Sequence, residues 1–89
     1  MEQEQRNKIL ELIDDLTPIP EIAILMDMSE SELRTYFDDP SLPEFKIFRK
    51  KIAEVQRDIR QRDIRLYVAG SPTAATAVSD HLHKMMQSL

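Results

Sequence analysis

The feature that most constrains the fold is a heptad pattern between residues 45 and 69, with one polar interruption at Arg62. Side chains recur there at alternating steps of three and four residues, which is the spacing of a helix seam that faces a partner. The seam consists of Phe45, Phe48, Ile52, Val55, Ile59, Arg62, Leu66 and Ala69. It predicts a helix about 40 Å long. Because such a helix extends well beyond a small bundle, its far half needs a partner.

Local breakers divide the rest of the chain into further helices. An apolar stripe over residues 2–16 (Ile9, Leu12, Ile13 and Leu16) predicts a first helix, and Thr17-Pro18-Ile19-Pro20 ends it. Ser41-Leu42-Pro43-Glu44 has the form of a capping box at the beginning of the long helix.

The only glycine marks the other end of the long helix. Gly70 fits a left-handed helix end, and Ser71-Pro72 then begins a last helix over residues 72–87. The short connection predicts that the last two helices form an antiparallel αα-hairpin. A second, shorter apolar stripe of Ile64, Tyr67 and Val68 lies beside the seam.

Composition agrees with a small helical protein. The chain has 42% apolar and 31% charged residues, no cysteine and no alternating strand pattern. No segment has the length of a membrane-spanning helix or the form of a signal peptide, so we expect a cytoplasmic protein that does not enter a membrane. We expect an all-α fold, with a three-helix bundle over residues 1–40 and a hairpin over residues 41–89.

The stretch from Ile22 to Phe37 predicts two short helices joined by a turn at Asp27-Met28-Ser29. Ser29 and Glu32 have the spacing of a capping box, in which each side chain bonds the other residue's amide. The outline is that of a helix-turn-helix. The stretch also resembles the core of bacterial and phage DNA-binding helix-turn-helices. That family usually has glycine in the turn, and here Asp27 must adopt the left-handed backbone.

Charge is distributed unevenly along the chain, whose net charge is −4. Residues 1–45 carry twelve acidic and three basic side chains, whereas residues 46–65 carry eight basic and three acidic ones. Four cations near the beginning of a helix oppose the helix dipole, so they indicate contact with phosphate or with an acidic partner. The alternating charges from Arg57 to Arg65 are more typical of salt bridges along an oligomer seam.

Two sets of candidate residues follow from these patterns. Exposed positions of the second short helix would reach base edges and the cluster at 46–51 would bind phosphates. The DNA-binding candidates are Ser31, Arg34, Thr35, Lys46, Arg49, Lys50 and Lys51. The candidates for a homo-oligomer interface are Ile52, Val55, Ile59, Leu66, Val78, Leu82 and Met85.

Catalytic chemistry is not indicated. His81 and His83 lie two residues apart and so point to different sides of a helix, which favours a solvated or helix-end role over a metal site. Ser79, Asp80 and His81 cannot assemble a triad as sequential neighbours on a helix. We expect no enzyme activity, no metal and no cofactor.

The layout is similar to that of phage terminase small subunits. Ala69-Gly70-Ser71-Pro72-Thr73-Ala74 resembles a stretch that opens their helix after the long one. The resemblance implies a non-enzymatic, ring-forming protein that binds viral double-stranded DNA and engages a larger protein partner. A phage-type or mobile-element regulator is equally compatible with these residues. The alternative is a protein-interaction module, in which the helix-turn-helix is only structural. The basic helix then docks an acidic partner or the acidic domain of a neighbouring protomer.

Overall fold

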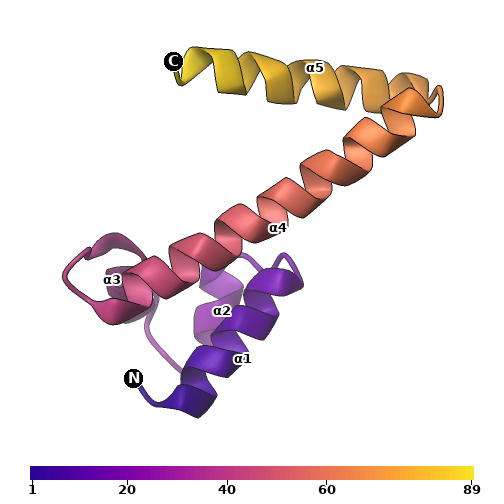
Figure 1. Ribbon diagram of the computed structural model, residues 1–89. Coiled ribbons are helices and arrows are strands. Elements are labelled where there is room, and N and C mark those ends of the chain that lie inside the picture. The colour runs from indigo at the N-terminus through magenta and orange to yellow at the C-terminus, as the bar shows by residue number, and fades with distance from the viewer. The chain divides into compact units, whose positions relative to one another are not determined.

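The structure, a computed structural model, describes all of residues 1–89 and contains five helices and no strand. The helices are α1 (Gln3–Asp14), α2 (Ile19–Leu25), α3 (Glu30–Asp38), α4 (Pro43–Val68) and α5 (Pro72–Gln87) (Figure 1). The all-α prediction is confirmed. No helix combines the length and the apolar composition that crossing a bilayer requires.

The chain divides into two units, Met1–Val55 and Gln56–Leu89, and α4 contributes to both. The first unit has one continuous core made by α1, α2, α3 and the first turns of α4. The fully or almost fully buried side chains of this core are Ile9, Leu12, Ile13, Ile22, Ala23, Leu33, Phe37 and Phe48. Phe37 and Phe48 stack with their ring centroids 5.1 Å apart.

The boundary expected at residue 40 therefore differs from the observed one. Phe48 is completely buried in the N-terminal core, and Ile52 and Val55 pack partly buried against it. A three-helix bundle of this size has little apolar surface to bury, so the beginning of α4 joins it as a fourth helix.

Two non-glycine residues with left-handed backbones make the corners of the first unit. Asp27 has φ 55°, as the turn between α2 and α3 was expected to need, and the Met28 amide closes the corner by donating to the Ala23 carbonyl at 2.9 Å. Leu16 has φ 61° and is exposed, whereas the sequence placed it on the buried stripe of the first helix. That prediction was wrong because α1 ends at Asp14, before the stripe does.

Helix caps follow the sequence at two places. The Ser29 hydroxyl accepts the Glu32 amide of α3 at 3.1 Å, and the Ser71 hydroxyl accepts the Ala74 amide of α5 at 3.3 Å. Gly70 has φ 95°, in agreement with its expected left-handed role at the end of α4. The Ser29 amide does not donate the reciprocal hydrogen bond to the Glu32 carboxylate.

The capping box expected at Ser41 and Glu44 is not formed either. Ser41 donates both its hydroxyl and its amide to Asp39 Oδ1, at 2.7 and 2.9 Å. Glu44 is buried and accepts two hydrogen bonds from Arg6 of α1, at 3.0 and 3.2 Å. A distant cation therefore replaces the local cap as the partner of this carboxylate.

The second unit has almost no core of its own. Only Ala74, in the first turn of α5, is buried there. After the turn at Gly70, α5 diverges from the second half of α4 (Figure 1). One side-chain hydrogen bond joins the two helices, between His81 Nε2 and Asp63 Oδ2 at 2.9 Å. The close antiparallel hairpin stays a prediction.

Candidate functional site

α3 presents the three candidate base-reading residues on its exposed side. Ser31, Arg34 and Thr35 are all exposed, while Leu33 and Phe37 on the opposite side are buried in the core. α2 packs directly against α3. The cap at Ser29 fixes the first turn of α3, so this exposed face begins at a defined position. Its interpretation as a DNA-reading face stays a prediction.

Local contacts at α3 already engage all three side chains, and the weakest of them is a 3.5 Å contact between the Ser31 and Ser29 hydroxyls. Arg34 donates from Nε and Nη2 to Glu30 Oε1, at 3.0 and 2.8 Å. Thr35 donates its hydroxyl to the Ser31 carbonyl at 3.0 Å. Both members of the Arg34–Glu30 pair are about half exposed, and such surface pairs contribute only about 0.2–1 kcal/mol. A phosphate or a guanine edge can therefore replace Glu30 at modest cost.

Two members of the basic cluster have structural partners. Arg49 donates from Nε to the Phe37 carbonyl at 2.8 Å and from Nη2 to Asp38 at 3.1 Å, so it caps the C-terminal end of α3. Lys51 lies 3.2 Å from Asp14 of α1. Packing of α4 against its neighbours therefore accounts for these two cations without a nucleic acid.

Lys46 and Lys50 differ from the other two. They lie four residues apart, one turn along α4, and both are exposed. Neither forms an ion pair, and together they border a shallow depression beside Pro43 and Ile47. They are the cations of this cluster that remain free for a polyanion, in a unit that carries thirteen acidic and seven basic side chains.

Two carboxylates close to this surface have lowered pKa values. Hydrogen bonds from the hydroxyl and the amide of Ser41 lower the pKa of Asp39. The pKa of Glu44 is lowered chiefly by a hydrogen bond from its own amide, with Arg6 adding to the effect and burial opposing it. Both groups are therefore ionised at neutral pH, and Glu44 anchors the beginning of α4 to α1.

The seven candidate interface residues are split between the two units. Ile52 and Val55 pack against the N-terminal core, which leaves them only partly available to another chain. Ile59 and Val78 are half-buried, and Leu66, Leu82 and Met85 are exposed. Self-association through these residues stays a prediction.

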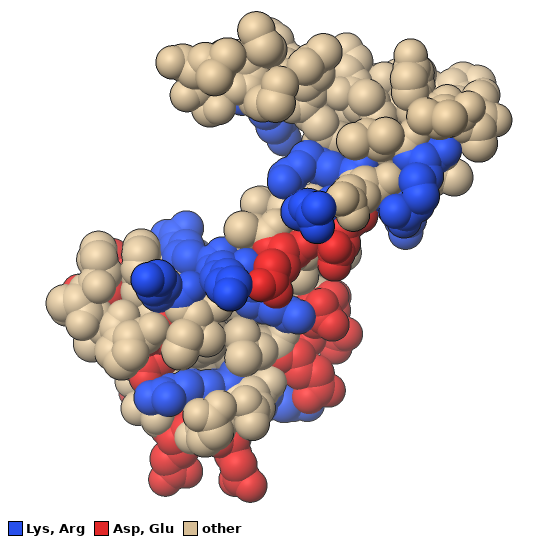
Figure 2. Space-filling view, viewed as in Figure 1, with Lys and Arg blue, Asp and Glu red and all other residues tan.

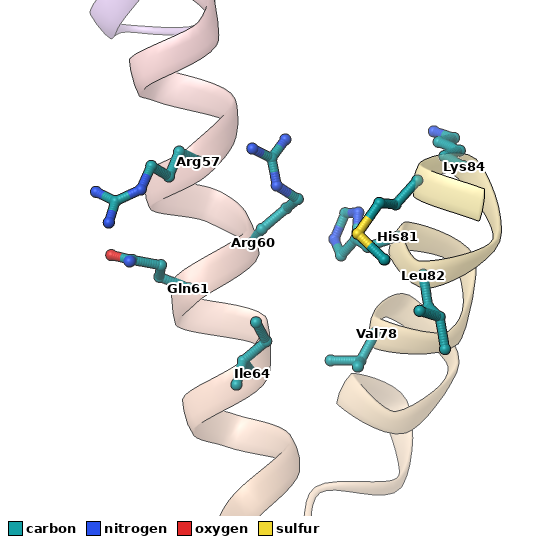
Figure 3. Close-up of a pocket in the computed structure, with 9 residues that line it drawn as sticks. Arg57, Arg60, Gln61, Ile64, Val78, His81, Leu82 and Lys84 are labelled. Carbon is teal, nitrogen blue, oxygen red and sulfur yellow. The ribbon is translucent and has the colours of Figure 1, made fainter. Parts of the chain in front are cut away.

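A groove of about 720 Å³ lies between the second half of α4 and α5 in the C-terminal unit. Its apolar lining comes from Ile64 of α4 and from Val78, Leu82 and Met85 of α5, and its cations are Arg57, Arg60 and Lys84. Figure 3 shows Ile64 and Val78 facing each other across the groove, with Arg60 extending into the space between the helices.

Sequence reasoning identified parts of this groove without bringing them together. The stripe that contains Ile64 and the apolar face of α5 were both visible in the spacing of residues. The link between His81 and Asp63 was not, because it joins positions 18 residues apart on two helices. His81 is half-buried and hydrogen bonded, so the expected solvated role holds only for His83, which is exposed.

No group of three or more His, Asp or Glu side chains is arranged to hold a metal ion. Comparisons with known protein families, with curated proteins and with solved structures found no match to this chain. Functional inference therefore depends on the geometry of its own residues.

Proposed function

We propose that the N-terminal unit is a non-enzymatic binder of double-stranded DNA, with α2 and α3 acting as a helix-turn-helix. The observation that carries the proposal is the pair of exposed, unpaired lysines at the beginning of α4, Lys46 and Lys50. Neither lysine contributes to the core or to an ion pair. Protein stability therefore does not explain these two lysines, whereas contact with DNA phosphates does.

α3 supplies the reading surface in this proposal. Its exposed Arg34 has the fork geometry that pairs with the edge of guanine, and Ser31 can contact bases or phosphates. Glu30 and Glu32 in the first turn oppose DNA, so most of the affinity must come from the lysines. The similarity to terminase small subunits adds a narrower hypothesis, in which the duplex is a viral packaging site and several copies bind together.

The test is fluorescence anisotropy of a labelled mixed-sequence duplex, at about 50 mM and about 200 mM salt. Lys50→Glu should weaken binding to all sequences and reduce the salt slope by about one. Arg34→Ala should instead relax the preference among sequences. Lys8→Glu is the matched control. Lys8 is an exposed lysine of the same unit, on α1, and its substitution changes the net charge by the same amount.

Two results would contradict the proposal. The first is a wild-type protein that does not bind DNA even at low salt. The second is an equal loss of binding in Lys8→Glu and Lys50→Glu, which would mean that only the net charge of the unit matters.

A second candidate function is favoured by the surface of the C-terminal unit. Eight of its large apolar side chains are exposed, namely Ile64, Leu66, Tyr67, Val68, Leu82, Met85, Met86 and Leu89. Exposed apolar surface of this extent is typical of a protein-interaction site. Such a module needs no DNA binding by α3.

A further inference from the structure

The groove of the C-terminal unit lies between two helices, and no third helix of that unit covers it. Its apolar lining is open, since Leu82 and Met85 remain 54% and 55% exposed. On α5, Val78, Leu82 and Met85 follow the spacing 0, 4, 7 of a single helix face, and all three line the groove. That face and Ile64 of α4 can both be covered by one further amphipathic helix.

The charges around the groove select the kind of helix that fits it. Arg57 and Arg60 of α4 and Lys84 of α5 line the groove, and none of them forms an ion pair. Asp63, which precedes the lining residue Ile64, is already hydrogen bonded to His81, which also lines the groove. In Figure 2 the surface of α5 is almost free of charge, and basic side chains follow the adjoining part of α4. An occupant with acidic flanks therefore complements this surface.

No free segment of this chain has that chemistry. α1 and α3 are acidic, but their apolar sides are buried in the N-terminal core. α5 has a free apolar side, but Asp80 is its only acidic residue. The C-terminal unit carries five basic and three acidic side chains, so a second copy would bring like charge to the basic groove.

We propose that the groove binds an amphipathic helix of another protein, with apolar residues at helical spacing and carboxylates along both flanks. Ile64, Val78, Leu82 and Met85 receive the apolar side, and the carboxylates pair with Arg57, Arg60 and Lys84. Burial of the apolar side supplies most of the affinity, and the charge pairs give the site its selectivity. The site shares no residue with the proposed DNA surface, so the two proposals can fail separately.

The probe is a synthetic helical peptide of about four turns, with leucines along one face and glutamates beside them. A matched peptide has lysine at every glutamate position. Each peptide carries a fluorescent label, and its anisotropy is measured with the full chain and without DNA. The glutamate peptide should bind in the micromolar range, and the lysine peptide should bind at least about tenfold more weakly.

Variants of the protein locate the binding. Leu82→Glu should weaken binding of the glutamate peptide by about 10- to 100-fold, because it places a carboxylate in the apolar lining. Leu25→Glu is the matched control and should have no effect, since Leu25 is a leucine of similar exposure (56%) in the other unit. Arg60→Glu should weaken the glutamate peptide and strengthen the lysine peptide. This reversal is independent of how well Leu82→Glu folds.

Three outcomes would overturn the proposal. The first is no binding of the glutamate peptide up to about 1 mM. The second is equal binding of the two peptides, which would indicate unselective apolar contact. The third is a dimer, detected by light scattering, that Leu82→Glu dissociates and the glutamate peptide does not. In that case a second copy of the chain occupies the groove.

Discussion

α4 belongs to both units, and its two halves have opposite environments. In the N-terminal half, Phe48 is fully buried and Ile52 and Val55 are partly buried against the core of Met1–Val55. In the C-terminal half, Leu66 continues the same heptad spacing but is 46% exposed. A continuous heptad seam therefore shows that a helix has one apolar side, but it does not show what covers that side. In the N-terminal unit, α1, α2 and α3 cover the apolar side of α4. In the C-terminal unit, that side remains exposed.

The largest expected difference between the two halves is in the free energy of unfolding. Phe48→Ala should destabilise the protein by about 3–5 kcal/mol, since it removes a buried ring that stacks on Phe37. Leu66→Ala should cost less than about 1 kcal/mol, since the side chain is already half in water. Urea unfolding followed by circular dichroism measures both values. Equal losses would mean that the C-terminal half of the seam is also covered in solution.

The periodic features were predictable because helix formation is local. The Gly70-Ser71-Pro72 sequence specifies a stop and a start within three residues, and α5 begins and ends where the pattern places it. The cover of α4 was not predictable in the same way, because Phe48 and Leu66 both lie on the same apolar seam. Only the packing of α1, α2 and α3 distinguishes them, and that packing depends on residues far away in the sequence.

Dependence on tertiary packing also limited what the sequence could indicate about the candidate site. Lys46 and Arg49 look equivalent in a basic cluster, yet Arg49 caps α3 and Lys46 is free. Glu44 has the spacing of a local cap, but its carboxylate bonds Arg6, 38 residues earlier. Residue type and spacing identify which groups can bind a partner, and the tertiary fold decides which of them are already occupied.

Glu44 provides the second prediction, which concerns how the N-terminal unit holds α4. Glu44→Gln should destabilise the protein by about 1–3 kcal/mol at neutral pH, because the buried acceptor of the Arg6 hydrogen bonds loses its charge. Thermal melts at several pH values measure the effect.

The sign of the pH dependence follows from the lowered pKa of Glu44. The folded protein holds this carboxylate ionised at pH values where the unfolded chain protonates it. The stabilisation is therefore complete above the unfolded value of about 4.3 and is lost as pH falls through the lower folded pKa. The acid side of the stability profile should be less steep in Glu44→Gln, and an unchanged profile would contradict this account.

The third prediction compares left-handed corners in the two units. Leu16 has φ 61° and an exposed side chain, so Leu16→Gly should stabilise the N-terminal unit by about 1 kcal/mol through relief of backbone strain. Gly70→Ala should destabilise by a similar amount. An added Cβ at Gly70 meets no atom within 4 Å, so its effect is purely conformational. Urea midpoints of the two variants should move in opposite directions, and a shift in the same direction would contradict the assigned backbone.

The smallest expected effect on stability tests whether the face of α3 has a role beyond folding. Glu30→Gln removes the Arg34 ion pair and one acidic group from the first turn of α3, which should cost about 0.5 kcal/mol in urea unfolding. The same change frees the Arg34 guanidinium and removes a repulsive charge, so affinity for a mixed-sequence duplex should rise several-fold. Stability and DNA affinity therefore change in opposite directions if α3 meets DNA. If affinity stays constant while stability falls, Arg34 only stabilises the helix. The exposed face of α3 then gives the N-terminal unit no role in DNA binding that the C-terminal unit lacks.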